Sequence, residues 1–306
     1  MAMRRDPPHR SLWSGLADVP GASAGDEEIG VLGVPFDGAS SFRAGSSEAP
    51  QRIRSLTPHV APFSEEGVSL AGLRLRDYGD AALGDSWEAV RQSAEQAARP
   101  VFRHPLAIFL GGDHSVTIPL ASAASDVLDG PLGVLHLDAH LDLMDRFEGR
   151  PWSHACALRR VLDLPAMNPA CCAAVGIRSW LPEELAFVED HPELLVRTAR
   201  DVRQGGIESI ADAVCDRLAQ AAAVYVTLDI DILDPAFAPG TGTPEAAGLT
   251  TRDLLELLRV VFERLPVRVL DLVEVSPPLD QSDITSVAAI KVLYESFGWM
   301  QQRLDP

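Results

Sequence analysis

The sequence predicts an α/β protein, in which a largely parallel sheet of about eight strands lies between two layers of helices in one domain. Short, continuous apolar runs such as 106–110 (LAIFL) and 223–230 (AVYVTLDI) are typical of strands that are covered on both faces. Amphipathic stretches with helical spacing separate these runs along the chain. Strands that alternate with helices in this way are characteristic of parallel sheets.

The predicted strands and helices follow one another along most of the chain. Ser86 and Thr250 are suitable N-cap residues for two of the helices. The expected strands are 29–34, 73–79, 106–110, 132–138, 172–177, 194–198, 223–230 and 267–275, and the expected helices are 86–99, 207–220, 250–264 and 283–298.

The composition narrows the class of protein. We expect residues 1–28 to be a flexible lead-in and 29–306 to be a single catalytic domain. No apolar stretch approaches the roughly 18 residues of a membrane helix, and the N-terminus lacks the apolar segment of a secretory signal, so we expect a cytoplasmic protein without membrane contact. The four cysteines include no CxxC pair and are expected to be reduced. A net charge of -18 argues against nucleic acid as a partner and is compatible with a cationic substrate.

Acidic residues and histidines gather where predicted strands end. Asp138, His140 and Asp142 follow one strand at alternate positions, and in extended backbone such positions share a face. The other strand ends carry Asp113 and His114, Asp229 and Asp231, and Glu274. Because ligands of parallel sheets bind beyond the carboxyl ends of the strands, these side chains are expected to converge on one rim. His136 keeps the same phase as Asp138, so it is either a further ligand or a hydrogen-bonded core histidine.

Crowded carboxylates raise one another's pKa unless cations neutralise them. Two divalent ions about 3.5–4 Å apart, bridged by a shared aspartate, would neutralise such a group and would lower the pKa of a water molecule between them. Carboxylate and imidazole ligands suit manganese, zinc or iron, so residue type does not choose the metal. The alternative is a set of unrelated caps and turn aspartates, which their occurrence at four strand ends disfavours.

The same segments resemble the ureohydrolase (arginase and agmatinase) family. The similar segments are GGDHS at 111–115, DAHLD at 138–142, DIDILDPAFAPGTGTPE at 229–245, GVPFD at 33–37, GIRS at 176–179 and EVSPPLD at 274–280. Together they span most of the chain. The resemblance implies a three-layer αβα arginase-like fold and a homotrimer or homohexamer.

The resemblance also implies a reaction and residues that perform it. It implies two Mn²⁺ ions per subunit, which hydrolyse a guanidino compound to urea and an amine. Asp142 would steer the attacking water, Glu274 would hold the guanidinium group, and His154 would relay a proton to the leaving amine. The implied metal ligands are His114, Asp138, His140, Asp142, Asp229 and Asp231. One ion would be held by His114 and Asp142 and the other by His140 and Asp231, with Asp138 and Asp229 as bridges.

The expected substrate is a small cationic guanidino compound. Arginases have an asparagine where this chain has Met144, so arginine is disfavoured. The combined motifs are most similar to agmatinase, which predicts that agmatine is converted to putrescine, in polyamine biosynthesis. The alternatives are a guanidinobutyrase or guanidinopropionase that acts on an ω-guanidino acid.

Three segments depart from the pattern of the family, and two rival classes remain. The departures are 155–156, 44–47 and 246–247, of which the first two are expected to line the substrate entrance. A catalytically silent regulatory partner with the same fold would be expected to lose metal ligands. An amide deacetylase on a related fold would be expected to use one zinc ion and to lack the pair Asp229 and Asp231.

Overall fold

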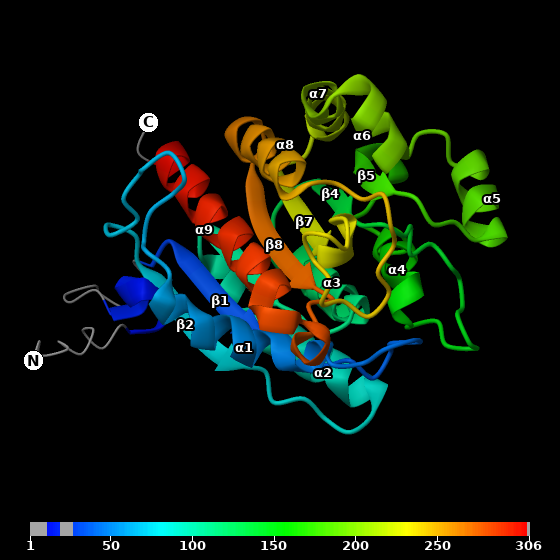
Figure 1. Ribbon diagram of the computed structural model, residues 1–306. Coiled ribbons are helices and arrows are strands. Elements are labelled where there is room, and N and C mark those ends of the chain that lie inside the picture. Colours follow the sequence, from blue (N-terminus) through cyan, green and yellow to red (C-terminus); the bar gives the residue numbers. More distant parts are fainter. Residues whose placement is uncertain (1–10, 19–26, 305–306) are drawn as a thin grey trace, which may run out of the picture.

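A computed structural model of the chain describes residues 11–18 and 27–304. Its single sheet contains eight parallel strands in the order β2-β1-β3-β8-β7-β4-β5-β6 (Figure 1). The strands are β1 (Ile29–Gly33), β2 (Leu75–Asp80), β3 (Leu106–Leu110), β4 (Leu132–Leu137), β5 (Cys172–Ile177), β6 (Leu195–Thr198), β7 (Ala223–Asp229) and β8 (Val267–Val273). The predicted parallel α/β fold is confirmed, and every predicted strand is present with ends that differ by at most two residues.

Helices cover both faces of the sheet. The α-helices of the described residues are α1 (Ala49–Leu56), α2 (Trp87–Ala98), α3 (Thr117–Val127), α4 (Ala157–Leu162), α5 (Pro182–Asp190), α6 (Ala199–Gly205), α7 (Ile207–Leu218), α8 (Thr251–Arg264) and α9 (Ile284–Leu304). Helices α1, α9, α8 and α7 pack in a row on one side, and α2, α3 and α4 pack on the other. Ser86 caps α2, and Thr250 forms a capping box with Asp253 at the start of α8, as predicted for both caps.

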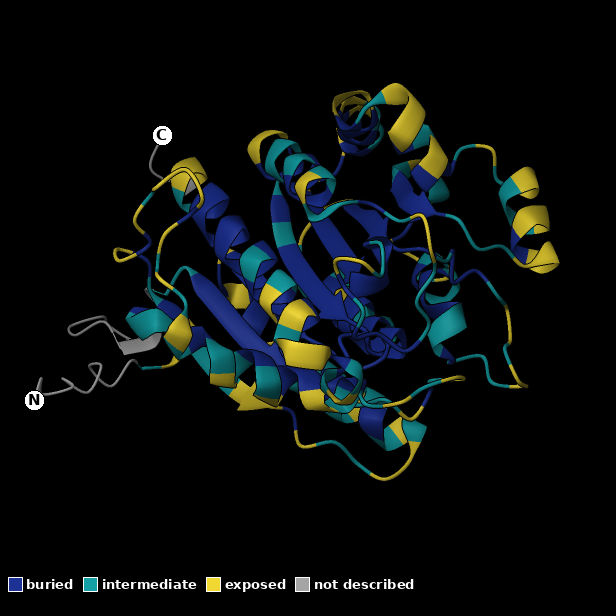
Figure 2. Cartoon of the chain, viewed as in Figure 1, coloured by how far each residue is buried: buried dark blue, intermediate teal, exposed yellow. Residues whose placement is uncertain are grey.

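Each central strand contributes alternate side chains to two separate cores. In β3, Leu106, Ile108 and Leu110 pack toward the α7–α9 side, whereas Ala107 and Phe109 pack toward α2 and α3. This alternation explains why the strands read as continuous apolar runs, because both faces are buried. Figure 2 shows the central strands as buried and the outer helix faces as exposed.

Part of the predicted lead-in packs against the domain. Residues Leu12–Asp18 form 3-10 turns, and the Trp13 side chain is fully buried and donates to Asp77 at 2.6 Å. Ser14 contacts Tyr294 of α9 at 2.7 Å. The rest of the predicted lead-in, apart from Ser11, Glu27 and Glu28, lies outside the described residues. No helix in the described ranges has the length and apolar character needed to cross a membrane.

Candidate active site

The order of the sheet brings the four motif-bearing strands together. Strands β3, β8, β7 and β4 are consecutive neighbours, although they lie far apart in the sequence. Their carboxyl ends therefore place His114, Glu274, Asp229 and Asp138 at one rim of the sheet. This adjacency is the structural reason why the acids and histidines converge.

The backbone at these strand ends turns instead of continuing as strand. Strand β4 ends at Leu137, so Asp138, His140 and Asp142 lie in a turn, and Asp231 lies in a 3-10 turn that follows β7. The expectation that these residues share the face of an extended strand was therefore wrong, although the side chains still meet. Asp142 (φ 54°) and Glu274 (φ 62°) adopt the left-handed conformation, which is costly for residues with a Cβ and is often found at functional sites.

His114 lies among three of the predicted ligands. Its Nδ1 atom is 3.0 Å from Asp138 Oδ2, 3.0 Å from Asp142 Oδ2 and 3.5 Å from Asp229 Oδ2. All four side chains are buried. One imidazole nitrogen thus faces three carboxylates that are contributed by two different strand ends.

A second group shares Asp138 with the first. His140 Nδ1 is 3.3 Å from Asp138 Oδ1 and 3.2 Å from Asp231 Oδ2. His136 lies behind Asp138, with Nε2 at 3.2 Å from Asp138 Oδ2 and at 3.0 Å from the carbonyl oxygen of His140. The contact with the carbonyl favours the hydrogen-bonded role for His136, because it occupies the nitrogen that faces Asp138.

The pKa values reflect how tightly the charges are packed. Burial raises the pKa of Asp229 well above its usual value, and Asp231 and Asp138 raise it further. Burial alone would lower the pKa of His114 and His140, but their contacts with the carboxylates outweigh it and raise both. The group therefore attracts positive charge, in the form of protons or of cations.

The donor atoms fit a pair of divalent cations. His114 Nδ1 and Asp138 Oδ2 are buried and have no hydrogen-bond partner, although they lie 3.0 Å apart. Ligand atoms of Asp138, His140 and Asp231 lie within 4.8 Å of one another, and so do those of His114, His136 and Asp138. Because His136 contacts the carbonyl oxygen of His140, the further ligands beside His114 and Asp138 would be Asp142 and Asp229, which lie 3.0 and 3.5 Å from His114 Nδ1. Imidazole and carboxylate ligands of this kind suit manganese and other first-row metals.

The predicted catalytic residues lie next to these groups. Glu274 is buried, and its Oε1 atom accepts a hydrogen bond from the backbone N–H of His114 at 2.9 Å. His154 Nδ1 is 3.8 Å from the same oxygen, and His154 Nε2 is 2.8 Å from Ser41 Oγ. Burial, followed by the charge of Asp113, raises the pKa of Glu274 well above its usual value.

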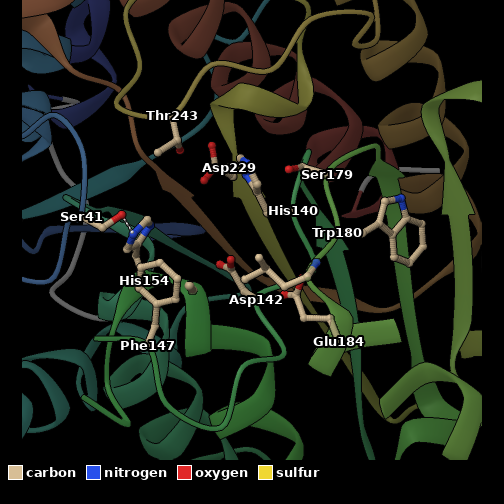
Figure 3. Close-up of a pocket in the computed structure, with 12 residues that line it drawn as sticks. Ser41, His140, Asp142, Phe147, His154, Ser179, Trp180, Glu184, Asp229 and Thr243 are labelled. Carbon is tan, nitrogen blue, oxygen red and sulfur yellow. Dashed lines mark hydrogen bonds between the residues drawn. The ribbon is translucent and has the colours of Figure 1, made fainter. Parts of the chain in front are cut away.

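A pocket of about 200 Å³ opens beside the candidate ligands. In Figure 3, Ser41 and His154 lie on one side, Trp180 lies on the other, and Asp142 and His140 lie between them. The lining residues are Ser41, His140, Asp142, Phe147, His154, Ala155, Ser179, Trp180, Leu181, Glu184, Asp229 and Thr243. Our reading of the sequence did not single out Phe147, Trp180 or Glu184, because nothing in their local pattern distinguishes them from ordinary loop and helix residues.

The three departing segments lie in different places relative to this pocket. Ala155 lines it, as expected, but 44–47 do not, and Ser41 lines that side instead. The segment 246–247 lies outside the pocket. It is held by Arg178, which donates to the carbonyl oxygens of Glu245 and Ala246.

Comparison with known proteins decides the family. The pattern of the arginase family matches residues 27–298. The chain belongs to the arginase family. It is 35% identical to proclavaminate amidinohydrolase of Streptomyces clavuligerus (87% of this chain, 85% of the relative) and 32% identical to guanidinopropionase of Pseudomonas aeruginosa (88% and 85%). The crystal structure of agmatine ureohydrolase of Thermoplasma volcanium superimposes with a TM-score of 0.83 at 30% identity, and the match covers 93% of this chain and 94% of that one.

Membership of the arginase family makes the chain an amidinohydrolase that acts on guanidino compounds. This confirms the predicted class of enzyme. The names of these relatives refer to three different substrates at similar identity, so overall similarity does not choose among them. The residues that line the pocket have to indicate the substrate.

Proposed function

We propose that this amidinohydrolase uses two Mn²⁺ ions and that its substrate is agmatine, which it would cleave to urea and putrescine. The observation that carries the choice of substrate is the charge of the pocket walls. Glu184 contributes a carboxyl group in addition to the proposed metal ligands Asp142 and Asp229, while Phe147 and Trp180 contribute apolar surface. Among the described residues, no lysine or arginine lines the pocket.

These walls favour a substrate whose tail is a cation. Burial raises the pKa of Glu184, and the hydrogen bonds that it accepts from the backbone N–H groups of Leu143 (3.1 Å) and Leu181 (2.9 Å) oppose this because they favour its ionised form. Two like charges about 4 Å apart repel by about 4 kcal/mol at an effective dielectric constant of about 20. In its ionised form, Glu184 would repel the carboxylate of an ω-guanidino acid in this way, and it would attract the ammonium group of agmatine.

The residues of the site would divide the chemistry among them. When bound, the two cations supply a water molecule that loses a proton near neutral pH. His114, Asp138, His140, Asp142, Asp229 and Asp231 would hold them. Asp142 would also accept a hydrogen bond from this water and orient it toward the guanidinium carbon. Glu274 would accept hydrogen bonds from the planar guanidinium group.

His154 would protonate the leaving amine. It lines the pocket, its Nε2 atom is 2.8 Å from Ser41 Oγ, and its Nδ1 atom is 3.8 Å from Glu274. The proton would be released to the amine nitrogen as the C–N bond breaks, so that this nitrogen leaves as a neutral amine and not as an amide anion.

A urea-release assay tests the proposed substrate. With Mn²⁺ present, agmatine is expected to give a kcat/KM at least about tenfold above those of 4-guanidinobutyrate, 3-guanidinopropionate and arginine, which corresponds to about 1.4 kcal/mol, a third of the repulsion above. Comparable or higher turnover of either acid would refute the choice of agmatine and support a guanidinobutyrase or guanidinopropionase. No urea from any of the four would refute agmatine as the substrate.

A matched pair of variants tests the acidic wall. Glu184→Gln should reduce the preference for agmatine over 4-guanidinobutyrate by about tenfold or more. Glu183→Gln changes the neighbouring residue of α5, which is exposed, and should leave the preference unchanged. An unchanged preference in Glu184→Gln, with normal circular dichroism, would show that Glu184 does not select the substrate.

We also propose, from the family resemblance, that the chain forms a homotrimer or homohexamer, and, from the character of the N-terminal sequence, that it works in the cytoplasm. Light scattering of the purified protein tests the assembly, and fractionation of cells that produce it tests the compartment. A monomer in light scattering would refute the first of these proposals, and recovery in a secreted or membrane fraction would refute the second.

A further inference from the structure

A chain of buried hydrogen bonds runs behind His114, on the side away from the pocket. His114 Nε2 is 2.8 Å from Thr227 Oγ1, and Thr227 Oγ1 is 3.3 Å from Thr117 Oγ1. Thr117 donates to Asp271 Oδ2 at 2.8 Å. These four residues are buried and come from three elements and one strand end, so solvent does not offer them other partners.

The direction of each hydrogen bond in this chain follows from the previous one. Asp271 Oδ2 is an acceptor, and it takes the single hydroxyl proton of Thr117. Thr117 can then only accept from Thr227, which uses the hydroxyl proton of Thr227. Thr227 can in turn only accept from His114, so the proton of the neutral imidazole must lie on Nε2.

The position of this proton determines what His114 presents to the candidate metal site. With hydrogen on Nε2, the lone pair of Nδ1 faces Asp138, Asp142 and Asp229. In the other tautomer an N–H group would point at the place where a cation would be held. A histidine ligand commonly depends on a partner at its second nitrogen for this reason.

We infer that Asp271, acting through Thr117 and Thr227, is a positioning residue that fixes the tautomer and the ring orientation of His114 for metal binding. The inference rests on the proposed two-metal function. It gives a role to Asp271, a fully buried carboxylate in the middle of the sheet that touches neither the pocket nor the ligands. The carboxylate would act over a distance of three hydrogen bonds.

Tyr225 provides a control within the same network. Its hydroxyl donates to Asp271 Oδ2 at 2.6 Å but takes no part in the path to His114. Removal of the Tyr225 hydroxyl therefore disturbs the same carboxylate without breaking the path. Removal of the Thr117 hydroxyl breaks the path and leaves Thr227 free to donate to His114, which permits the wrong tautomer.

The experiment measures Mn²⁺ binding by electron paramagnetic resonance of the free ion during a titration. Thr117→Val should lower the affinity for one of the two ions by about 10–100-fold, as is usual when a metal-binding histidine loses the partner of its second nitrogen. Thr117→Ser restores the hydroxyl and should bind both ions like wild type, and so should Tyr225→Phe. Circular dichroism accompanies each variant to show that it is folded.

A second readout reports the tautomer directly. In Zn²⁺-loaded protein, nitrogen NMR should show the ring proton of His114 on Nε2, and its signal should shift in Thr117→Val but not in Tyr225→Phe. If Thr117→Val and Tyr225→Phe weaken binding equally, or if Thr117→Val binds both ions and shows the signal of wild type, the inference is overturned. Failure of the wild-type protein to bind Mn²⁺ would instead refute the proposed function.

Discussion

The crowded acids at the strand ends predict that Asp229→Asn has opposite effects with and without metal. Without metal, Asp229 is buried beside Asp231 and Asp138, and its pKa is raised by burial and by their charges. Asparagine removes a buried carboxyl group whose ionised form is disfavoured, and its carbonyl can still accept the hydrogen bond that Asp229 receives from the N–H of Asp231 at 2.8 Å. The metal-free variant should therefore melt at the same temperature as wild type or higher.

With Mn²⁺ present, wild type should melt at a higher temperature than Asp229→Asn. A cation that binds only the native state and is present at about 100 times its Kd adds about 2.7 kcal/mol to the free energy of unfolding, hence about 5 kcal/mol for two ions. Unfolding entropy is about 2.1 cal/mol/K per residue, so a chain of 306 residues should gain about 8 °C in its melting temperature. Asp229→Asn, which loses a proposed bridge between the ions, should gain less than half of this.

The measurement is thermal unfolding at pH 7.5, followed by circular dichroism, with chelator or with Mn²⁺. Asp145→Asn is the matched control, because Asp145 is exposed and lies only three residues from Asp142. It should keep the full Mn²⁺ shift. A full shift in Asp229→Asn would refute the role of Asp229 as a ligand, and the absence of any shift in wild type would refute the metal site.

Three further predictions concern protons, backbone and turnover. The raised pKa values of His114 and His140 mean that, without metal, each imidazole carries a proton on both ring nitrogens at neutral pH. Binding of Mn²⁺ should therefore release protons, and the affinity for Mn²⁺ should fall as the pH falls. Calorimetry in buffers of different ionisation enthalpy measures the number of protons released, and proton uptake on Mn²⁺ binding would contradict the prediction. Ala247 is exposed and has φ 64°, so Ala247→Gly should raise the free energy of unfolding by about 0.5–1 kcal/mol in urea titrations, whereas Ala246→Gly, outside the left-handed region, should not. His154→Ala should lower kcat by about 100-fold and leave bound Mn²⁺ unchanged by elemental analysis; loss of the ions would mean that it is a ligand and not a relay.

Much of the fold could be predicted because hydrophobicity and burial are closely linked in this chain. Strands buried on both faces leave unbroken apolar runs, and α8 carries its buried residues at helical spacing behind Thr250. The helices that we did not predict have weaker signals. Helix α3 contains Pro119 and is apolar on most of its surface, and α4 is only six residues long.

The candidate site was predictable for a different reason. Its charged residues follow directly on apolar strands. A buried charge costs free energy unless it has a partner, so charged residues at the ends of buried strands stand out in the sequence. The turn geometry was not predictable, because nothing in the local sequence indicates positive φ at Asp142 and Glu274, and residues other than glycine seldom adopt it. Thr227 could have been found, since it lies two residues before Asp229 on a buried strand and therefore points to the same face.

The central position of β8 has a consequence for the order in which the molecule can form. The strand lies between β3 and β7, yet it begins at Val267, near the end of the chain. During synthesis, β3 and β7 emerge from the ribosome before the strand that joins them exists. The rim that gathers His114, Asp229 and Glu274 can therefore close only when nearly the whole polypeptide is available, and a nascent or truncated chain that stops before β8 should be unable to retain the ions.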